Sequence, residues 1–146
     1  DGLQRKIQAI KKAIACNQPD PKDPLDVLAK VGGFDIAGMC GIFLGGAALQ
    51  MPVVMDGFIS QVAALTAVRL VPECADYILA SHVSEEPGAN ILLETLNKDA
   101  FLTCGMRLGE GSGAVALFPI LDFASDIYHK MSTFMQADIE EYQPLS

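Results

Sequence analysis

Hydrophobic residues near the start of the chain recur with the period of an α-helix. Steps of three and four residues place four of them on one helical face: Leu3, Ile7, Ile10 and Ile14. Arginine and lysine residues between them give this helix a basic outer face. The pattern therefore predicts an amphipathic helix over residues 3–16, followed by a proline-rich loop over residues 17–24.

Beyond residue 24, short apolar runs bounded by turn residues alternate with longer apolar or alanine-rich runs. Short bounded runs predict buried strands, and long runs predict helices. The expected strands lie at 52–58, which ends in a polar turn, at 77–80 and at 101–106. The expected helices lie at 24–31, 35–49, 59–71, 84–96 and 114–135, the last with a kink at Pro119. Residues 136–146 are polar and are expected to fray.

The alternation of strands and helices predicts an α/β fold in which a parallel sheet is flanked by helices in three layers. Three strands are few for such a sheet. The chain also begins with Asp1 and not with Met. We therefore expect residues 1–146 to form one segment, about one half of a larger α/β domain, with a processed or truncated N-terminus.

The expected helix at 35–49 carries a ridge of small residues: Gly38, Gly41, Gly45 and Ala48. A ridge without side chains lets another backbone approach closely, so the pattern predicts tight packing against a sheet or helix.

The same region is free of charge from Ile36 to Met55, which is about the length of a membrane span. Gln50, Pro52 and several glycines interrupt it, and no Lys or Arg flanks it. A buried helix that leads into a buried strand gives the same run, and we favour that interpretation.

The charge balance excludes one class of partner. Ten Lys and Arg residues stand against eighteen Asp and Glu residues, so the net charge is −8. A nucleic-acid partner needs a basic footprint, and this chain does not carry one.

The four cysteines do not form a metal site, because none stands in a Cys-x-x-Cys pair and no histidine completes a set. Cys40 and Cys104 lie in apolar, glycine-rich surroundings and are expected to be small buried residues. Free thiols and the lack of a visible signal peptide favour a reducing cytoplasm.

Ligands of parallel α/β sheets bind at the carboxyl ends of the strands. Three loops of this chain are expected there, at 56–58, 81–88 and 109–113. In the last, Gly109, Gly111 and Gly113 alternate with Glu110 and a serine just before a helix. Either Glu110 is a carboxylate held at the helix start and aimed into a cleft, where it accepts a proton from a nitrogen base, or this is an ordinary capped turn.

The other two loops also leave alternatives open. Ser84 caps the following helix or contacts a phosphate, for which Lys6 or Arg107 supplies a cation. Asp56 contacts a sugar hydroxyl or a water, or it simply forms the turn before Gly57. His82 is a structural residue or a ligand contact. Ser, His and Asp are all present, but no Gly-x-Ser-x-Gly elbow follows an expected strand, which argues against a hydrolase triad.

Four strings occur in order along the chain: DPLDVLAKVGGFDIAGMCG, PVVMDGFIS, ASHVSEEPGA and MRLGEGSGA. Together they resemble the nicotinate-nucleotide–dimethylbenzimidazole phosphoribosyltransferase family, which acts in the lower-ligand branch of cobalamin synthesis. The resemblance covers residues 3–134 and implies that the chain is the C-terminal segment of one α/β phosphoribosyltransferase domain. The upstream part of the family's domain, with further site residues, is not in this sequence.

The resemblance implies a reaction between nicotinate mononucleotide and a benzimidazole. A ring nitrogen of the base attacks the anomeric carbon with inversion, nicotinate leaves, and α-ribazole phosphate forms. No metal or cofactor is required, because the pyridinium ring is already a good leaving group. The resemblance also implies a homodimer.

Residue by residue, the resemblance makes Glu110 the general base. Met106 and Leu108 border the flat base, and Gly109 and Gly111 lie beside it in the same loop. Ser84 and Lys6 contact the nucleotide phosphate. Asp56 is an acid near the reacting centre.

Two other hypotheses remain, a non-catalytic module that binds nucleotide or benzimidazole, and a dimerising fragment. For the leading hypothesis, we expect residues 1–146 alone to be inactive or far less active than an intact enzyme.

Overall fold

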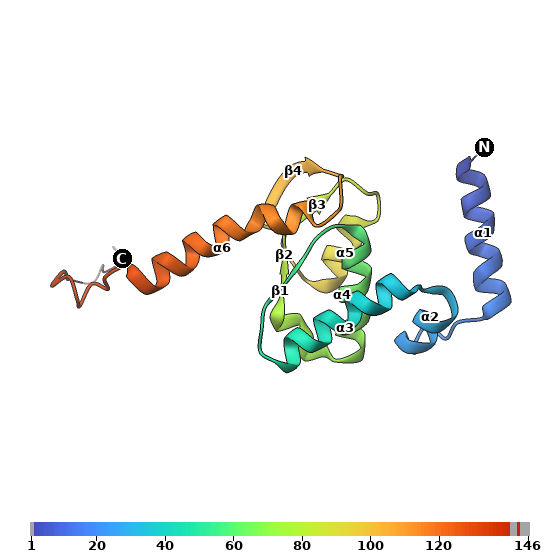
Figure 1. The fold of residues 1–146 in the computed structure, drawn as a ribbon, viewed down its shortest axis with the longest axis horizontal. Coiled ribbons are helices and arrows are strands. Elements are labelled where there is room, and N and C mark those ends of the chain that lie inside the picture. The colour runs from blue at the N-terminus through green and yellow to red at the C-terminus, as the bar shows by residue number, and fades with distance from the viewer. Residues whose placement is uncertain (1, 141–142, 144–146) are drawn as a thin grey trace.

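The computed structural model describes residues 2–140 and 143 (Figure 1). The helices are α1 (Gly2–Asn17), α2 (Pro24–Val31), α3 (Phe34–Ala48), α4 (Phe58–Leu70), η1, a 3-10 helix (Pro72–Tyr77), α5 (Ala89–Leu96) and α6 (Ser112–Lys130). The strands are β1 (Val53–Met55), β2 (Ile78–Ala80), β3 (His82–Ser84) and β4 (Leu102–Met106). The predicted succession of a helical N-terminal part and alternating strands and helices is confirmed.

All strand pairs are parallel, as predicted. Strand β1 pairs with β2, with Val54 opposite Leu79, and β3 pairs with β4, with an irregularity between His82 and Ser84. Ser81 connects the two pairs, because its N–H donates to the Met55 carbonyl at 3.0 Å and its own carbonyl accepts from Leu102 N–H at 2.9 Å. Residues 78–84 therefore form a central segment between β1 and β4, longer than the strand predicted at 77–80.

The core lies between the strands and the helices α3, α4 and α5. Its buried residues are small or aliphatic side chains with one aromatic ring: Cys40, Phe43, Met55, Ala63, Ala64, Ala67, Ile78, Ala80, Leu93 and Leu96. Three buried alanines on α4 let the neighbouring helices α3 and α5 pack closely against it, which explains why an alanine-rich run lies at the centre. The parallel pairs and their helices form part of an α/β domain.

Local capping signals fix some helix ends. The Asp23 carboxylate accepts hydrogen bonds from Leu25 N–H at 3.0 Å and Asp26 N–H at 3.2 Å, and Pro24 occupies the first turn of α2. This is the arrangement that the sequence predicts.

Two predicted helix boundaries are wrong. Helix α5 begins at Ala89 and not at Ser84, because Ser84 ends β3 and lies opposite Met106 of β4. The pairing of Ser84 with β4 outweighs the local sequence signals that favour a helix start at this position. Helix α6 ends at Lys130 and not at residue 135, although it continues through Pro119. Residues 136–140 lie beyond it, and the rest of the predicted frayed tail lies outside the described residues except for residue 143.

The packing predicted for the glycine ridge is not found among the residues that the structure describes. Gly38, Gly41 and Gly45 are exposed, and nothing lies within 4 Å of a side chain built at any of them. The close approach occurs instead at Gly46, where such a side chain would overlap Val53.

The cysteine prediction is half right. Cys40 is buried, as is Cys74, and burial raises the pKa of both thiols. Cys104 is exposed, because no described element covers the middle of β4.

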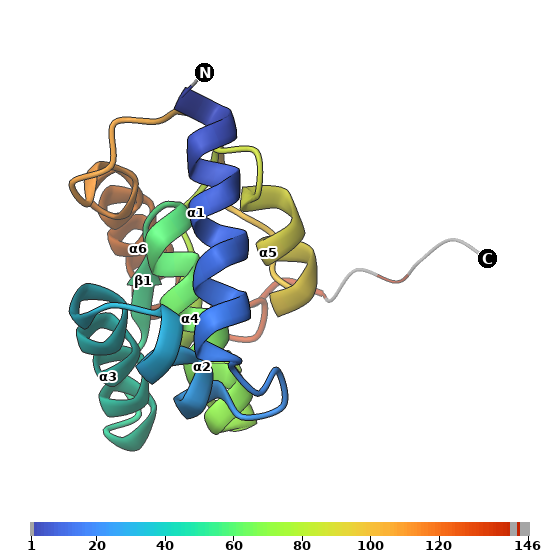
Figure 2. The same ribbon diagram turned by 90° about the vertical axis from the view of Figure 1, so that its right-hand side faces the viewer.

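The first and last helices extend from opposite sides of the molecule (Figure 1), and α1 stands in front of the other elements in Figure 2. No residue of α1 is buried; Ile10 is 60% exposed, and Phe123 of α6 is 68% exposed. Among the described residues, no helix combines the length and apolar character that a membrane span needs.

Candidate functional site

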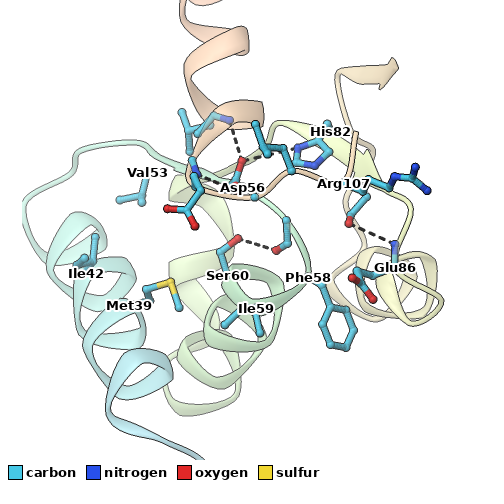
Figure 3. A pocket seen from close by; sticks show the side chains of 18 of the residues that line it. Met39, Ile42, Val53, Asp56, Phe58, Ile59, Ser60, His82, Glu86 and Arg107 are labelled. Atoms are coloured by element: carbon cyan, nitrogen blue, oxygen red, sulfur yellow. Dashed lines mark hydrogen bonds and ion pairs between the residues drawn. The ribbon is translucent and has the colours of Figure 1, made fainter. Parts of the chain in front are cut away.

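A cavity of about 650 Å³ opens at the carboxyl ends of β1 and β3. Its walls differ in character (Figure 3). On one side lie apolar residues of α3 and β1, namely Met39, Ile42, Phe43, Val53 and Val54. His82, Glu86 and Arg107 lie across from Met39, Ile42 and Val53 in Figure 3, and Asp56, Ser84 and Glu110 also line the cavity. Such a cavity suits a ligand that has an apolar part and a polar part.

The turn before α6 borders the cavity and has an unusual backbone. Three consecutive residues adopt the left-handed conformation, with φ of 76° at Gly109, 57° at Glu110 and 73° at Gly111. Glycine adopts this conformation without steric cost, which explains why Gly109 and Gly111 flank Glu110. For Glu110 the conformation costs on the order of 1 kcal/mol, and strain of this kind clusters at functional sites.

The side chain of Glu110 is exposed and lines the cavity. It makes no hydrogen bond or ion pair with any described residue. A carboxylate without a partner is free to accept a proton from a ligand. The arrangement thus has the features of the cleft-facing alternative and not of a capped turn alone.

Asp56 follows β1 directly and points at the start of α6. Its Oδ1 accepts hydrogen bonds from Gly113 N–H at 2.8 Å and from Ala114 N–H at 3.1 Å. Its Oδ2 accepts one from Gly111 N–H at 3.2 Å. Asp56 therefore contacts residues that lie 55 to 58 positions later in the sequence, at the border of the cavity (Figure 3).

His82 lies behind Asp56 and is 3% exposed. Its Nδ1 lies 2.9 Å from Ser81 Oγ and 3.9 Å from Asp56 Oδ1. Ser81 is itself fully buried, so its contact with Nδ1 restricts movement of the His82 ring.

Ser84 closes β3 at the polar side of the cavity and is 6% exposed. Its Oγ accepts a hydrogen bond from Glu86 N–H at 3.4 Å. The alternative that Ser84 caps a helix is wrong, because Gly88 occupies the N-cap of α5. Ser84 lines the cavity, so the phosphate alternative stays open, and Arg107 lines the same cavity.

The cavity therefore brings together six of the eight residues singled out in the sequence: Asp56, Ser84, Leu108, Gly109, Glu110 and Gly111. Met106 and Lys6 do not line it. Met106 pairs with Ser84 inside the sheet, and Lys6 is exposed on α1. Their roles at the base and the phosphate stay predictions.

Sequence reasoning missed the apolar wall from α3. Met39 and Ile42 belong to the uncharged run, which predicts only burial. Their spacing of three residues places them on one face of a helix, but nothing in the sequence says that this face borders a cavity.

Comparisons with known proteins agree on one family. A phosphoribosyltransferase family model matches residues 1–139. Nicotinate-nucleotide–dimethylbenzimidazole phosphoribosyltransferase of Ruminiclostridium cellulolyticum is 56% identical over 144 residues, which is 99% of this chain and 41% of the relative. The Escherichia coli enzyme of the same name is 48% identical over 95% of this chain and 39% of its own length.

A solved structure agrees as well. The crystal structure of this phosphoribosyltransferase from Thermus thermophilus matches with a TM-score of 0.87 and 39% identity, over 97% of this chain and 42% of the other. The chain thus spans about two-fifths of the length of the relatives that it matches. Within that span, sequence and fold agree that it belongs to the nicotinate-nucleotide–dimethylbenzimidazole phosphoribosyltransferase family.

Proposed function

We propose that this chain contributes part of the active site of an enzyme that transfers phosphoribose from nicotinate mononucleotide to dimethylbenzimidazole, in cobalamin synthesis. The observation that supports the proposal most directly is the unpartnered carboxylate of Glu110 at the border of a cavity with one apolar wall. The names of the relatives supply the two substrates.

The apolar wall is suited to the heteroaromatic base. Met39, Ile42 and Val53 offer aliphatic and thioether surface against which a flat ring gains contact area. Leu108 is on the same turn as Glu110, so it borders a ring whose nitrogen faces the carboxylate. The arrangement orients the base without requiring a charged contact to it.

The proposed chemistry at Glu110 is general-base catalysis. One ring nitrogen of the base uses its lone pair to form the bond to the anomeric carbon. The bond from that carbon to the pyridinium nitrogen breaks, and its electron pair leaves with nicotinate. The Glu110 carboxylate takes the proton from the other ring nitrogen, so that the product ring is neutral.

The polar side is suited to the nucleotide. Ser84 offers a hydroxyl, and Arg107 offers a guanidinium that can bind phosphate oxygens. Lys6, which the resemblance also places at the phosphate, is carried by an exposed helix and does not line this cavity. Its role, a homodimer and a cytoplasmic location are further parts of the proposal that rest on the resemblance.

Replacement of the proposed base tests this function. In this chain joined to the upstream part of the Ruminiclostridium cellulolyticum relative, Glu110→Gln keeps the size of the side chain and removes its basicity. We expect kcat to fall on the order of 10²- to 10⁴-fold, with little change in KM for nicotinate mononucleotide. Formation of α-ribazole phosphate is measured by liquid chromatography and mass spectrometry.

The matched control is Glu94→Gln, a change of the same type at an exposed position of α5 outside the cavity. This control should leave the rate unchanged. A rate for Glu110→Gln equal to that of the control would remove Glu110 from the base role.

A further inference from the structure

The carboxylate of Asp56 is committed to the backbone at the start of α6. The N–H groups of Gly111, Gly113 and Ala114 donate to its two oxygens at 3.2, 2.8 and 3.1 Å. The first turn of a helix leaves its N–H groups without partners inside the helix, and a side chain of the preceding residue normally accepts from them. Here the N-cap residue is Gly111, which has no side chain, so a residue after β1 takes over this task.

These contacts bear directly on Glu110. Gly111 follows it in sequence, and both residues belong to the left-handed turn. A left-handed Glu persists only where the surrounding structure fixes it. The hydrogen bond to Gly111 N–H holds one end of this turn, and the two to Gly113 and Ala114 hold the helix that follows.

The surroundings of Asp56 keep its side chain in place. Its side chain is 18% exposed, and His82 Nδ1 lies 3.9 Å from its Oδ1. A side chain at Gly113 would overlap His82, so the helix start, the ring and the carboxylate are in close contact. A carboxylate held by these contacts is suited to fixing the backbone conformation, and it has little freedom to move toward a substrate.

We propose that Asp56 is a positioning residue that fixes the turn carrying Glu110, and that it acts through this turn and not by touching the sugar. The inference rests on the proposed function, because it assigns Asp56 a role only in presenting the proposed base. Small displacements of a catalytic group are sufficient for such an effect, since misplacement by about 1 Å lowers rates on the order of 100-fold.

A double-mutant cycle in the same joined protein tests the proposal, with Asp56→Asn, Glu110→Gln and the double variant. The Asn amide has a single carbonyl oxygen, so it cannot accept hydrogen bonds on both sides as the carboxylate does. We expect Asp56→Asn to lower kcat on the order of tenfold and to change KM for nicotinate mononucleotide by less than about twofold. In the Glu110→Gln background, the same change should cause no further loss, because the group being positioned is already absent.

Asp76→Asn, at an exposed site of η1, is the matched control and should leave all constants unchanged. Hydrogen exchange followed by mass spectrometry provides a second readout. The amides of residues 111–114 should exchange faster in Asp56→Asn than in the control. A general loss of stability would instead accelerate exchange throughout and would lower activity in both backgrounds.

The outcomes separate the two proposals. Losses of equal size in both backgrounds, a raised KM, or unchanged exchange at 111–114 would overturn the positioning role while Glu110 stays essential. If Glu110→Gln itself has no effect on turnover, the proposed base and the positioning role fall together.

Discussion

At the scale of single residues, Gly113 is the position with the least room in the site. A methyl group there would overlap His82 Nδ1 and would lie 2.9 Å from Asp56 Oδ1. The ring cannot retreat easily, because Ser81 and His82 are both buried. Glycine is thus required by space and not by backbone conformation, since no positive φ is found at this residue.

We therefore expect Gly113→Ala to displace the first turn of α6. The change should lower the free energy of unfolding by about 1–3 kcal/mol, as overpacking does, and should also slow turnover. Urea unfolding and a turnover assay measure the two effects. Gly41→Ala is the matched control, because nothing lies within 4 Å of the added methyl group and alanine favours a helix interior by about 0.5–1 kcal/mol. Equal effects of the two substitutions would contradict the crowding argument.

The same scale shows how far the sequence could predict the site. The rule that ligands bind where parallel strands end indicates Asp56, Ser84 and Glu110, and all three line one cavity. Met106 does not line it, although it lies opposite Ser84 in the sheet, and no local signal in the sequence distinguishes these two residues. The hydrogen bonds that Asp56 accepts from the backbone of Gly111, Gly113 and Ala114 join segments too far apart for any local pattern to predict.

At the scale of elements, local signals place a helix start correctly only where tertiary pairing does not compete. Asp23 and Pro24 define the start of α2 in the sequence and in the structure. The segment after β3 carries equally good helix-start signals in Ser84 and Pro87, yet the helix begins later. The difference is tertiary: Ser84 pairs with β4 inside a sheet, and this pairing outweighs a local preference of a few tenths to about 1 kcal/mol.

The cap of α2 gives a prediction at this scale. Asp23→Ala removes the acceptor for Leu25 N–H and Asp26 N–H. We expect the free energy of unfolding to fall by about 1 kcal/mol, as measured by urea unfolding. Asp35→Ala is the control, because Asp35 lies in the first turn of α3 but makes no cap hydrogen bond. Equal losses in both variants would show that charge at the helix start matters and the cap hydrogen bonds do not.

At the scale of the whole molecule, the surface is too large for the mass. The accessible area is 10715 Å², whereas a compact monomer of 15.5 kDa exposes roughly 7,200 Å². Much of the excess comes from the projecting helices, where Ile10 and Phe123 are exposed, and from the open ridge of α3. No local pattern reveals this, because an amphipathic sequence shows that a face is apolar and not which element covers it.

The large exposed surface, and the fact that the chain spans only part of its relatives' length, predict that residues 1–146 alone have little activity. The relatives are more than twice as long, so the cavity described above holds only those site residues that fall within two-fifths of their length. Alone, the chain should form no α-ribazole phosphate at a rate comparable with an intact enzyme. Joined to the upstream part of the Ruminiclostridium cellulolyticum relative, which is 56% identical over the shared region, it should regain turnover.

Two measurements on this joined protein, product formation and melting temperature, distinguish the hypotheses. Product formation that Glu110→Gln abolishes supports an enzyme. A rise in melting temperature with benzimidazole or nucleotide but without product supports a binding module, and no ligand-induced rise supports a dimerising fragment. Turnover by residues 1–146 alone, at the rate of the joined protein, would contradict the view that the exposed helices and the ridge of α3 need partners before the cavity is complete.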